Sequence, residues 1–122
     1  MRFADYGYNL PEDGLYVTEK YYQEHPETVQ KLVRACIRGW NWTYEHREEA
    51  LDIVMEQVRH YNIGTNCYHQ RKMLDEILRL QTDKNGRRPY RLSREGFDTA
   101  MDILLPENTG ETNTLQYENF VK

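Results

Sequence analysis

The sequence predicts a mainly α-helical protein, with four to five helices and at most a short β segment. Apolar residues recur at helical spacing in several stretches, and residues that favour helix N-caps stand directly before most of these stretches. Of the 122 residues, 39% are hydrophobic and 30% are charged, a composition typical of folded domains. A chain of this length supports one modest hydrophobic core, so we treat it as one domain or part of one.

The strongest helical pattern lies between His25 and Trp42. Pro26 suits a first helical turn, where its missing N–H group costs nothing, and Glu27 complements the positive end of the helix dipole. Gly39 weakens a helix by about 1 kcal/mol relative to alanine, so we expect the helix to end between positions 41 and 46. The apolar stripe comprises Val29, Leu32, Val33, Cys36, Ile37 and Trp40.

The residues before this helix, 1–17, are aromatic and irregular. Glycine and proline punctuate them, and the run Pro-Glu-Asp-Gly from position 11 predicts a turn. Residues 15–17 have the composition of a short strand, which is stable only with a partner strand. Thr18 is then a good N-cap for a short helix to about Glu24, which His25 interrupts because it precedes a proline.

Three further helices complete a predicted helical body at residues 18–105. The first begins near Arg47 and is stopped by the glycine of the run 62–64. A turn at 83–86 separates the second from the third, and residues 106–122 form a tail whose aromatic residues dock on the body. The N-cap candidates are Thr65 or Asn66 for the second helix and Ser93 for the third. The inward-facing residues are Leu51, Val54, Met55 and Val58, then Met73, Leu74, Ile77 and Leu78, then Phe97, Ala100, Met101 and Leu104.

Charge and motif content argue against several functional classes. A net charge of -4 disfavours nucleic-acid binding, and the pair Arg87-Arg88 is too short to form a basic patch. No stretch approaches the roughly 20 apolar residues of a membrane span, and no signal peptide opens the chain. Because no nucleophile, base and orienting residue stand together, we predict a protein that is not an enzyme and needs no cofactor.

The histidines and cysteines are the candidates for a metal site or a disulfide. His60, Cys67 and His69 are the only grouping that resembles metal ligands, but no further residue completes a familiar zinc spacing. Surface histidines at a helix junction are the simpler interpretation, so no metal is predicted. A Cys36–Cys67 disulfide would require Cα atoms within about 7 Å, which leaves that pairing open.

The aromatic N-terminal stretch is the candidate ligand surface. Tyr6, Tyr8, Asn9 and Glu12 combine ring faces with a few polar groups, which is how proteins usually hold small polar ligands. The alternative interpretation is a surface segment whose tyrosines cover the helices.

Three stretches together resemble one protein family. They are Tyr6–Thr18, the run from His25 through Trp40 to Val54, and His69–Leu74 with Tyr117–Val121 at the end. They resemble the C-terminal part of the solute-binding proteins of ABC importers, in the branch of thiamine-precursor (no-message-in-thiamine) and sulfonate or nitrate binders. In that family a helix with Pro-Glu at its start and Gly-Trp near its end follows the last crossover between lobes.

The resemblance implies a two-lobed clamp, for which this chain is too short. We therefore expect a single partial domain over residues 1–122, a C-terminal fragment of an α/β periplasmic-binding-protein type II fold. The implied function is delivery of a small polar ligand, such as a thiamine pyrimidine precursor, to the membrane component of an ABC importer. The implied location of the full-length protein is periplasmic or membrane-anchored and extracytoplasmic.

Two other functions stay open. One is a fragment of a thiamine-pyrimidine biosynthetic enzyme, although the cysteine-rich motif of such enzymes is absent from these residues. The other is a small helical interaction domain. Because the helices would normally cover a sheet, their stripes need another partner, so we expect either self-packing as a helical bundle or a homodimer.

Overall fold

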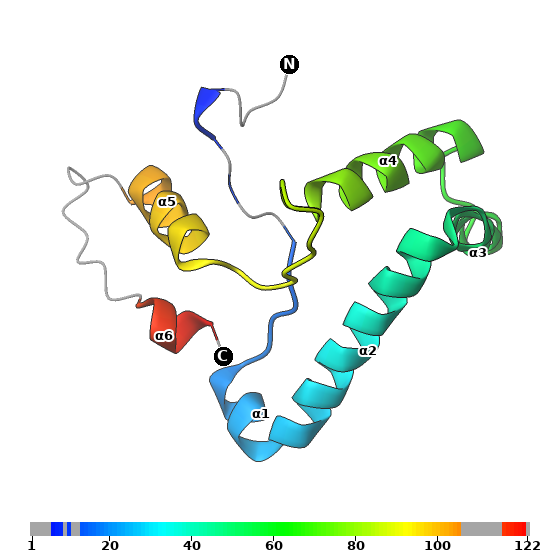
Figure 1. Ribbon diagram of the computed structural model, residues 1–122. Coiled ribbons are helices and arrows are strands. Elements are labelled where there is room, and N and C mark those ends of the chain that lie inside the picture. The colour runs from blue at the N-terminus through cyan, green and yellow to red at the C-terminus, as the bar shows by residue number, and fades with distance from the viewer. Residues whose placement is uncertain (1–5, 9, 11–12, 106–115, 122) are drawn as a thin grey trace. The chain divides into compact units, whose positions relative to one another are not determined.

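A computed structural model describes residues 6–8, 10, 13–105 and 116–121, and its described part contains six helices and no strand (Figure 1). The mainly α prediction is therefore confirmed. The chain divides into two compact units, Tyr16–Tyr90 and Met1–Leu15 with Arg91–Lys122. The helices are α1 (Glu19–Glu24), α2 (Pro26–Glu45), α3 (Arg47–His60), α4 (Cys67–Leu80), α5 (Arg94–Leu104) and α6 (Tyr117–Phe120).

The long helix α2 ends at the predicted place and passes directly into α3. His46 is both the C-cap of α2 and the N-cap of α3. Its backbone N–H donates to the carbonyl oxygen of Trp42 at 2.9 Å, and its ring stacks on the Trp42 ring at a centroid distance of 4.8 Å. The hydrogen bond and the stacked rings fix the conformation of His46, the single residue between the two helices. Figure 1 shows α3 beyond the C-terminal end of α2.

The core of the unit Tyr16–Tyr90 lies mainly between α3 and α4. Its buried hydrophobic residues are Ala50, Leu51, Val58 and Leu78, all from these two helices. No residue of α2 is buried. Hydrophobic stabilisation scales with the apolar area removed from water, so this unit depends on the contact between α3 and α4.

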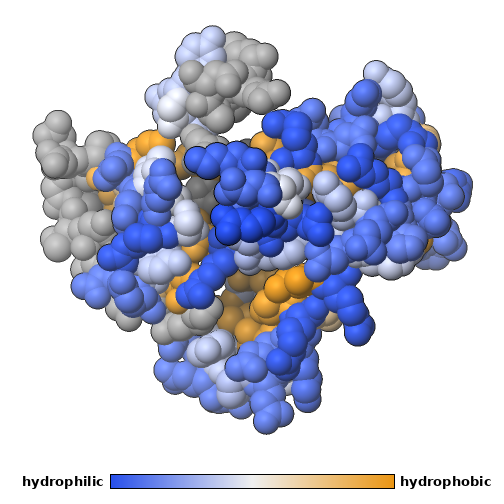
Figure 2. Space-filling view, viewed as in Figure 1, coloured by the Kyte–Doolittle hydropathy of each residue, from blue (hydrophilic) through white to orange (hydrophobic). Residues whose placement is uncertain are grey.

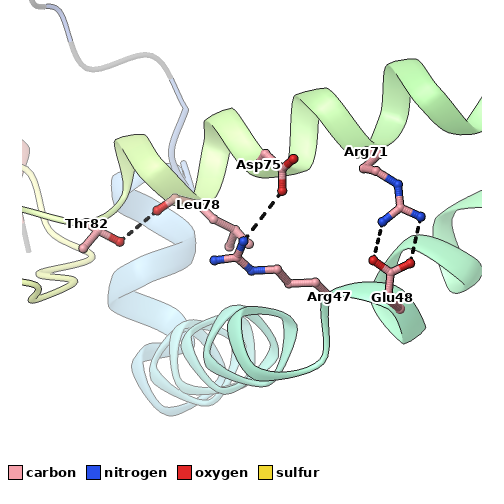
Figure 3. A network of polar contacts seen from close by, with 6 residues as sticks. All are labelled: Arg47, Glu48, Arg71, Asp75, Leu78 and Thr82. Atoms are coloured by element: carbon pink, nitrogen blue, oxygen red, sulfur yellow. Dashed lines mark hydrogen bonds and ion pairs between the residues drawn. The ribbon is translucent and has the colours of Figure 1, made fainter.

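Two ion pairs join α3 to α4 at the side of this core (Figure 3). Arg71 donates two hydrogen bonds to the Glu48 carboxylate, one to each oxygen, and Arg47 lies 3.7 Å from a carboxylate oxygen of Asp75. The hydrogen bonds from Arg71 lower the pKa of Glu48. All four side chains are substantially exposed, so these pairs orient the helices more than they stabilise them.

Helix ends follow local capping rules, with one correction to the sequence predictions. The side chains of Thr18, Asn66 and Ser93 accept backbone N–H bonds as N-caps, as predicted. The left-handed residue after α3 is Asn62, with φ 50°, whereas a stop by Gly64 was expected. Asparagine tolerates this conformation through its short polar side chain, so the helix ends two residues earlier.

The prediction of a short strand at residues 15–17 was wrong. The structure assigns no strand there, and all of these residues are exposed. An isolated strand leaves its backbone groups without ladder partners, and the described part of the chain supplies no neighbouring strand.

A closed turn follows α4, as expected from the sequence. The Asp83 carboxylate accepts backbone N–H bonds from Asn85 and Arg87, each at 2.8 Å. The backbone N–H of Arg87 is the main cause that lowers the pKa of Asp83. Gly86 takes the left-handed conformation that this tight turn requires, with φ 76°.

The other unit has its described packing around Phe97. The Phe97 ring lies 5.7 Å from the rings of both Tyr117 and Phe120, measured between centroids. The Tyr117 hydroxyl donates to the carbonyl oxygen of Leu92 at 2.8 Å. The aromatic end of the chain therefore docks against α5, as predicted, but through a short helix, α6, that sequence reasoning did not anticipate. No described helix has both the length and the apolar character needed to cross a membrane.

Candidate ligand-binding surface

The structure describes two of the four predicted ligand-binding residues, and both present their rings to solvent. Tyr6 is 66% exposed and Tyr8 is 56% exposed. Gly7 between them has φ +87°, a conformation that side-chain-bearing residues rarely adopt, so the chain turns between the two rings. Asn9 and Glu12 lie outside the described residues. Exposed phenol rings can stack on a planar ring and offer a hydroxyl to a polar edge.

A cavity that the sequence analysis missed lies in the unit Tyr16–Tyr90. Its volume is about 270 Å³, just below the usual range of small-molecule pockets. Gln70 is one of its few polar residues, and its side-chain amide donates to the Thr65 hydroxyl at 3.1 Å. The lining comes from the end of α2, from α3 and from α4, and consists of Trp40, Trp42, Thr43, Ala50, Leu51, Ile53, Val54, Gln70, Met73, Leu74 and Ile77.

A second cavity, of about 540 Å³, lies between α5 and α6 and is more polar. Arg94 lies at its wall, 2.6 Å from a carboxylate oxygen of Glu118, 3.6 Å from one of Asp98, and 5.2 Å above the centre of the Tyr117 ring. The pKa of Glu118 is lowered, first by its own backbone N–H and then by Arg94. The Arg94 guanidinium is therefore paired with two carboxylates, and all three side chains are more than half exposed.

The apolar stripe of α2 stays partly uncovered in the unit Tyr16–Tyr90. Leu32 is 47% exposed and Val33 is 37% exposed, although the pattern predicts both on the packed face. Figure 2 shows hydrophobic surface along the middle of α2. The 3.6-residue period identified the face correctly, but within the described residues neither α3 nor α4 buries it.

The histidines, cysteines and paired arginines of the sequence analysis are not brought together into one site within the described residues. No group of three or more histidine, cysteine, aspartate or glutamate side chains in the described ranges is arranged to hold a metal ion. Cys36 is half-buried and Cys67 is exposed, and both are free thiols, which answers the open question of their pairing. Arg87 pairs with Asp83 at 3.3 Å within the turn after α4, whereas Arg88 lies over the ring of Tyr44 on α2, so the two arginines point to different partners.

Comparison with known proteins confirms the family resemblance over the first part of the chain. Residues 1–50 match the family model described as NMT1/THI5 like. This segment contains the tyrosines of the candidate surface and runs through α2 into the first turn of α3. A segment of 71 residues is 34% identical to riboflavin-binding protein RibY of Chloroflexus aurantiacus. That segment is 58% of this chain and 20% of the relative, so the match spans about a fifth of that protein's length. No solved structure matches.

Proposed function

We propose that this chain is part of a solute-binding protein that captures a small polar ligand and delivers it to an ABC importer. The observation that carries the proposal is the match of residues 1–50 to the NMT1/THI5-like family. The relative named as a riboflavin-binding protein supports the same class of function. In this class the partner is the membrane component of the importer, and the full-length protein acts outside the cytoplasm, in the periplasm or anchored to the membrane.

The ligand class that we propose is a planar nitrogen heterocycle with polar substituents. A thiamine pyrimidine precursor and riboflavin both have this chemistry, and a planar ring system is the natural partner of an exposed tyrosine face. Tyr6 and Tyr8 then form an aromatic wall, and Asn9 and Glu12 bond the polar edge of the ligand. The exposure of both tyrosines supports this assignment, because each keeps more than half of its surface open to solvent.

Replacement of both tyrosines by alanine tests the assignment. The full-length protein that contains this chain is titrated with riboflavin, followed by quenching of the flavin fluorescence, and with the hydroxymethyl aminopyrimidine precursor of thiamine, followed by calorimetry. Stacking of one ring on one aromatic side chain contributes about 1–3 kcal/mol, so we expect the Tyr6→Ala, Tyr8→Ala double variant to bind about ten-fold or more weakly. Tyr61→Ala is the matched control, because Tyr61 is similarly exposed and lies outside the predicted site.

Two results would contradict different parts of this proposal. Equal affinity of the double variant and the unmodified full-length protein would reject Tyr6 and Tyr8 as ligand residues. Failure of both probes to bind the unmodified full-length protein saturably would reject the proposed ligand class.

A second candidate function is a helical interaction domain that forms a homodimer. The uncovered stripe of α2 favours it, because exposed apolar patches of this kind usually recruit a partner. A second copy of the chain would bury Leu32 and Val33 against the same residues of its partner, as two-fold symmetric interfaces do.

Sedimentation equilibrium distinguishes the two candidates. If the stripe is a dimer interface, the chain dimerises at high concentration and Leu32→Glu makes it a monomer, because the new carboxylate would be buried without a partner. Gln30→Glu introduces the same charge off the stripe and is expected to leave the dimer intact. A monomeric unmodified chain at high concentration would exclude the dimer.

A further inference from the structure

The segment of residues 83–90, which follows α4, makes two kinds of contact. Its first part, the turn at 83–87, is closed on itself by hydrogen bonds of Asp83 with Asn85, Gly86 and Arg87. These bonds involve no other element. The turn therefore needs no support from α2 to keep its shape.

Near the end of the segment, Arg88 and Tyr90 contact α2 instead. The Arg88 guanidinium lies 4.0 Å from the centre of the Tyr44 ring, within the range of a cation–π contact. The Tyr90 hydroxyl donates to the side-chain oxygen of Asn41 at 3.0 Å, and this pair is partly buried. Asn41 and Tyr44 are neighbours on one face of α2, so both contacts fasten the segment to the same place.

The backbone of Tyr90 has a conformation that is unfavourable for a residue with a side chain. Its φ is 45°, in the left-handed region, where a bulky side chain without glycine's freedom is strained. Pro89 precedes it, and the proline ring restricts the backbone of Pro89 itself and of Arg88 before it. Such a residue keeps its conformation only while surrounding contacts hold it there.

Tyr90 is also the last residue of the unit Tyr16–Tyr90, and Arg91 begins the return of the chain into the other unit. We propose that residues 88–90 are a latch on α2, closed by the Tyr90–Asn41 hydrogen bond and the Arg88–Tyr44 contact. Opening the latch lets the Tyr90 backbone relax to negative φ, which changes the direction in which the chain leaves this unit. The latch is a conformational device independent of the proposed ligand function.

Chymotrypsin cleavage after residue 90 reports the latch directly. The protease binds a large aromatic side chain in its specificity pocket, so the ring of residue 90 must leave α2 before the bond to Arg91 can be cut. The pocket accepts phenylalanine as well as tyrosine, so Tyr90→Phe removes the hydroxyl without removing the cleavage site. When closing is faster than cleavage, the rate follows the population of the open form.

We expect Tyr90→Phe to raise the rate of this cleavage about five-fold, the change in an equilibrium that corresponds to one hydrogen bond of ordinary net strength. Asn41→Ala removes the acceptor of the same bond and is expected to have the same effect. The double variant should then be no faster than either single variant, because the two changes remove one shared interaction. Cleavage after Tyr61, an exposed residue at the end of α3, is the reference in the same digest, and Tyr61→Phe is the matched variant.

Three results would overturn the latch. One is an unchanged rate after residue 90 in Tyr90→Phe, and another is an increase in only one of the two single variants. The third is an equal increase after residues 61 and 90, which would mean that the whole unit loosens and that the latch does not open separately.

Discussion

Leu78→Ala is expected to lower the free energy of unfolding of the unit Tyr16–Tyr90 by about 2–5 kcal/mol, the range for truncating a fully buried leucine. Leu78 is 1% exposed and lies on α4, facing the core that α3 and α4 share. The substitution removes apolar contacts and leaves a cavity that the remaining buried residues, Ala50, Leu51 and Val58, are too few to close. A small domain has about 5–15 kcal/mol of stability in total, so the loss is a large fraction of it.

Thermal and urea unfolding followed by far-UV circular dichroism measure this effect. Leu80→Ala is the matched control, because Leu80 is the last residue of the same helix and is mostly exposed. We expect the control to change stability by less than about 0.5 kcal/mol, as surface substitutions usually do. Equal unfolding midpoints for the two variants would show that the contact between α3 and α4 is not the core of this unit.

Phe97→Ala is expected to remove about 3–5 kcal/mol from the packing of α5 with α6, the usual range for a buried phenylalanine. Phe97 is 7% exposed and is the ring that both Tyr117 and Phe120 contact. Without it α6, which is four residues long, has no aromatic surface on α5 to pack against. A helix this short does not persist in water without tertiary contacts.

Hydrogen exchange of the α5 and α6 amides measures this loss. We expect the amide of Phe120, which bonds the carbonyl of Gln116, to lose its protection in Phe97→Ala. Leu104→Ala is the control, since Leu104 lies on the same helix and is 65% exposed, although the sequence pattern placed it on the inward face. Retained protection at Phe120 in Phe97→Ala would show that α6 is held in place by other contacts, such as the pair of Arg94 and Glu118.

Much of the secondary structure follows from local sequence. Pro26 at the start of α2, the N-caps Asn66 and Ser93, and the turn at Asp83 all act within a few residues, so each can be recognised without knowledge of the rest of the chain. The same local rules explain the miss at Asn62. Asparagine and glycine both tolerate positive φ, and the sequence alone does not decide which of two nearby candidates takes it.

The candidate ligand surface was predictable only in part. The clustering of Tyr6 and Tyr8 marks an aromatic segment, and the structure adds that both rings are exposed. Whether Asn9 and Glu12 join them stays a prediction, because both lie outside the described residues. The cavity at the end of α2 was missed because its lining comes from three helices, and no spacing along one helix identifies such a site.

The sequence by itself determined the helical class, the apolar faces of the helices and most of their ends. Only the tertiary structure decided which of those faces are covered. Leu78 is buried because α3 packs on α4, whereas Leu32 has the same kind of position on α2 and stays exposed. Periodicity states which side of a helix is apolar, but burial needs a second surface, and the identity of that surface depends on contacts between residues far apart in the chain. The Tyr90–Asn41 bond, which joins residues 49 positions apart, depends on the fold in the same way.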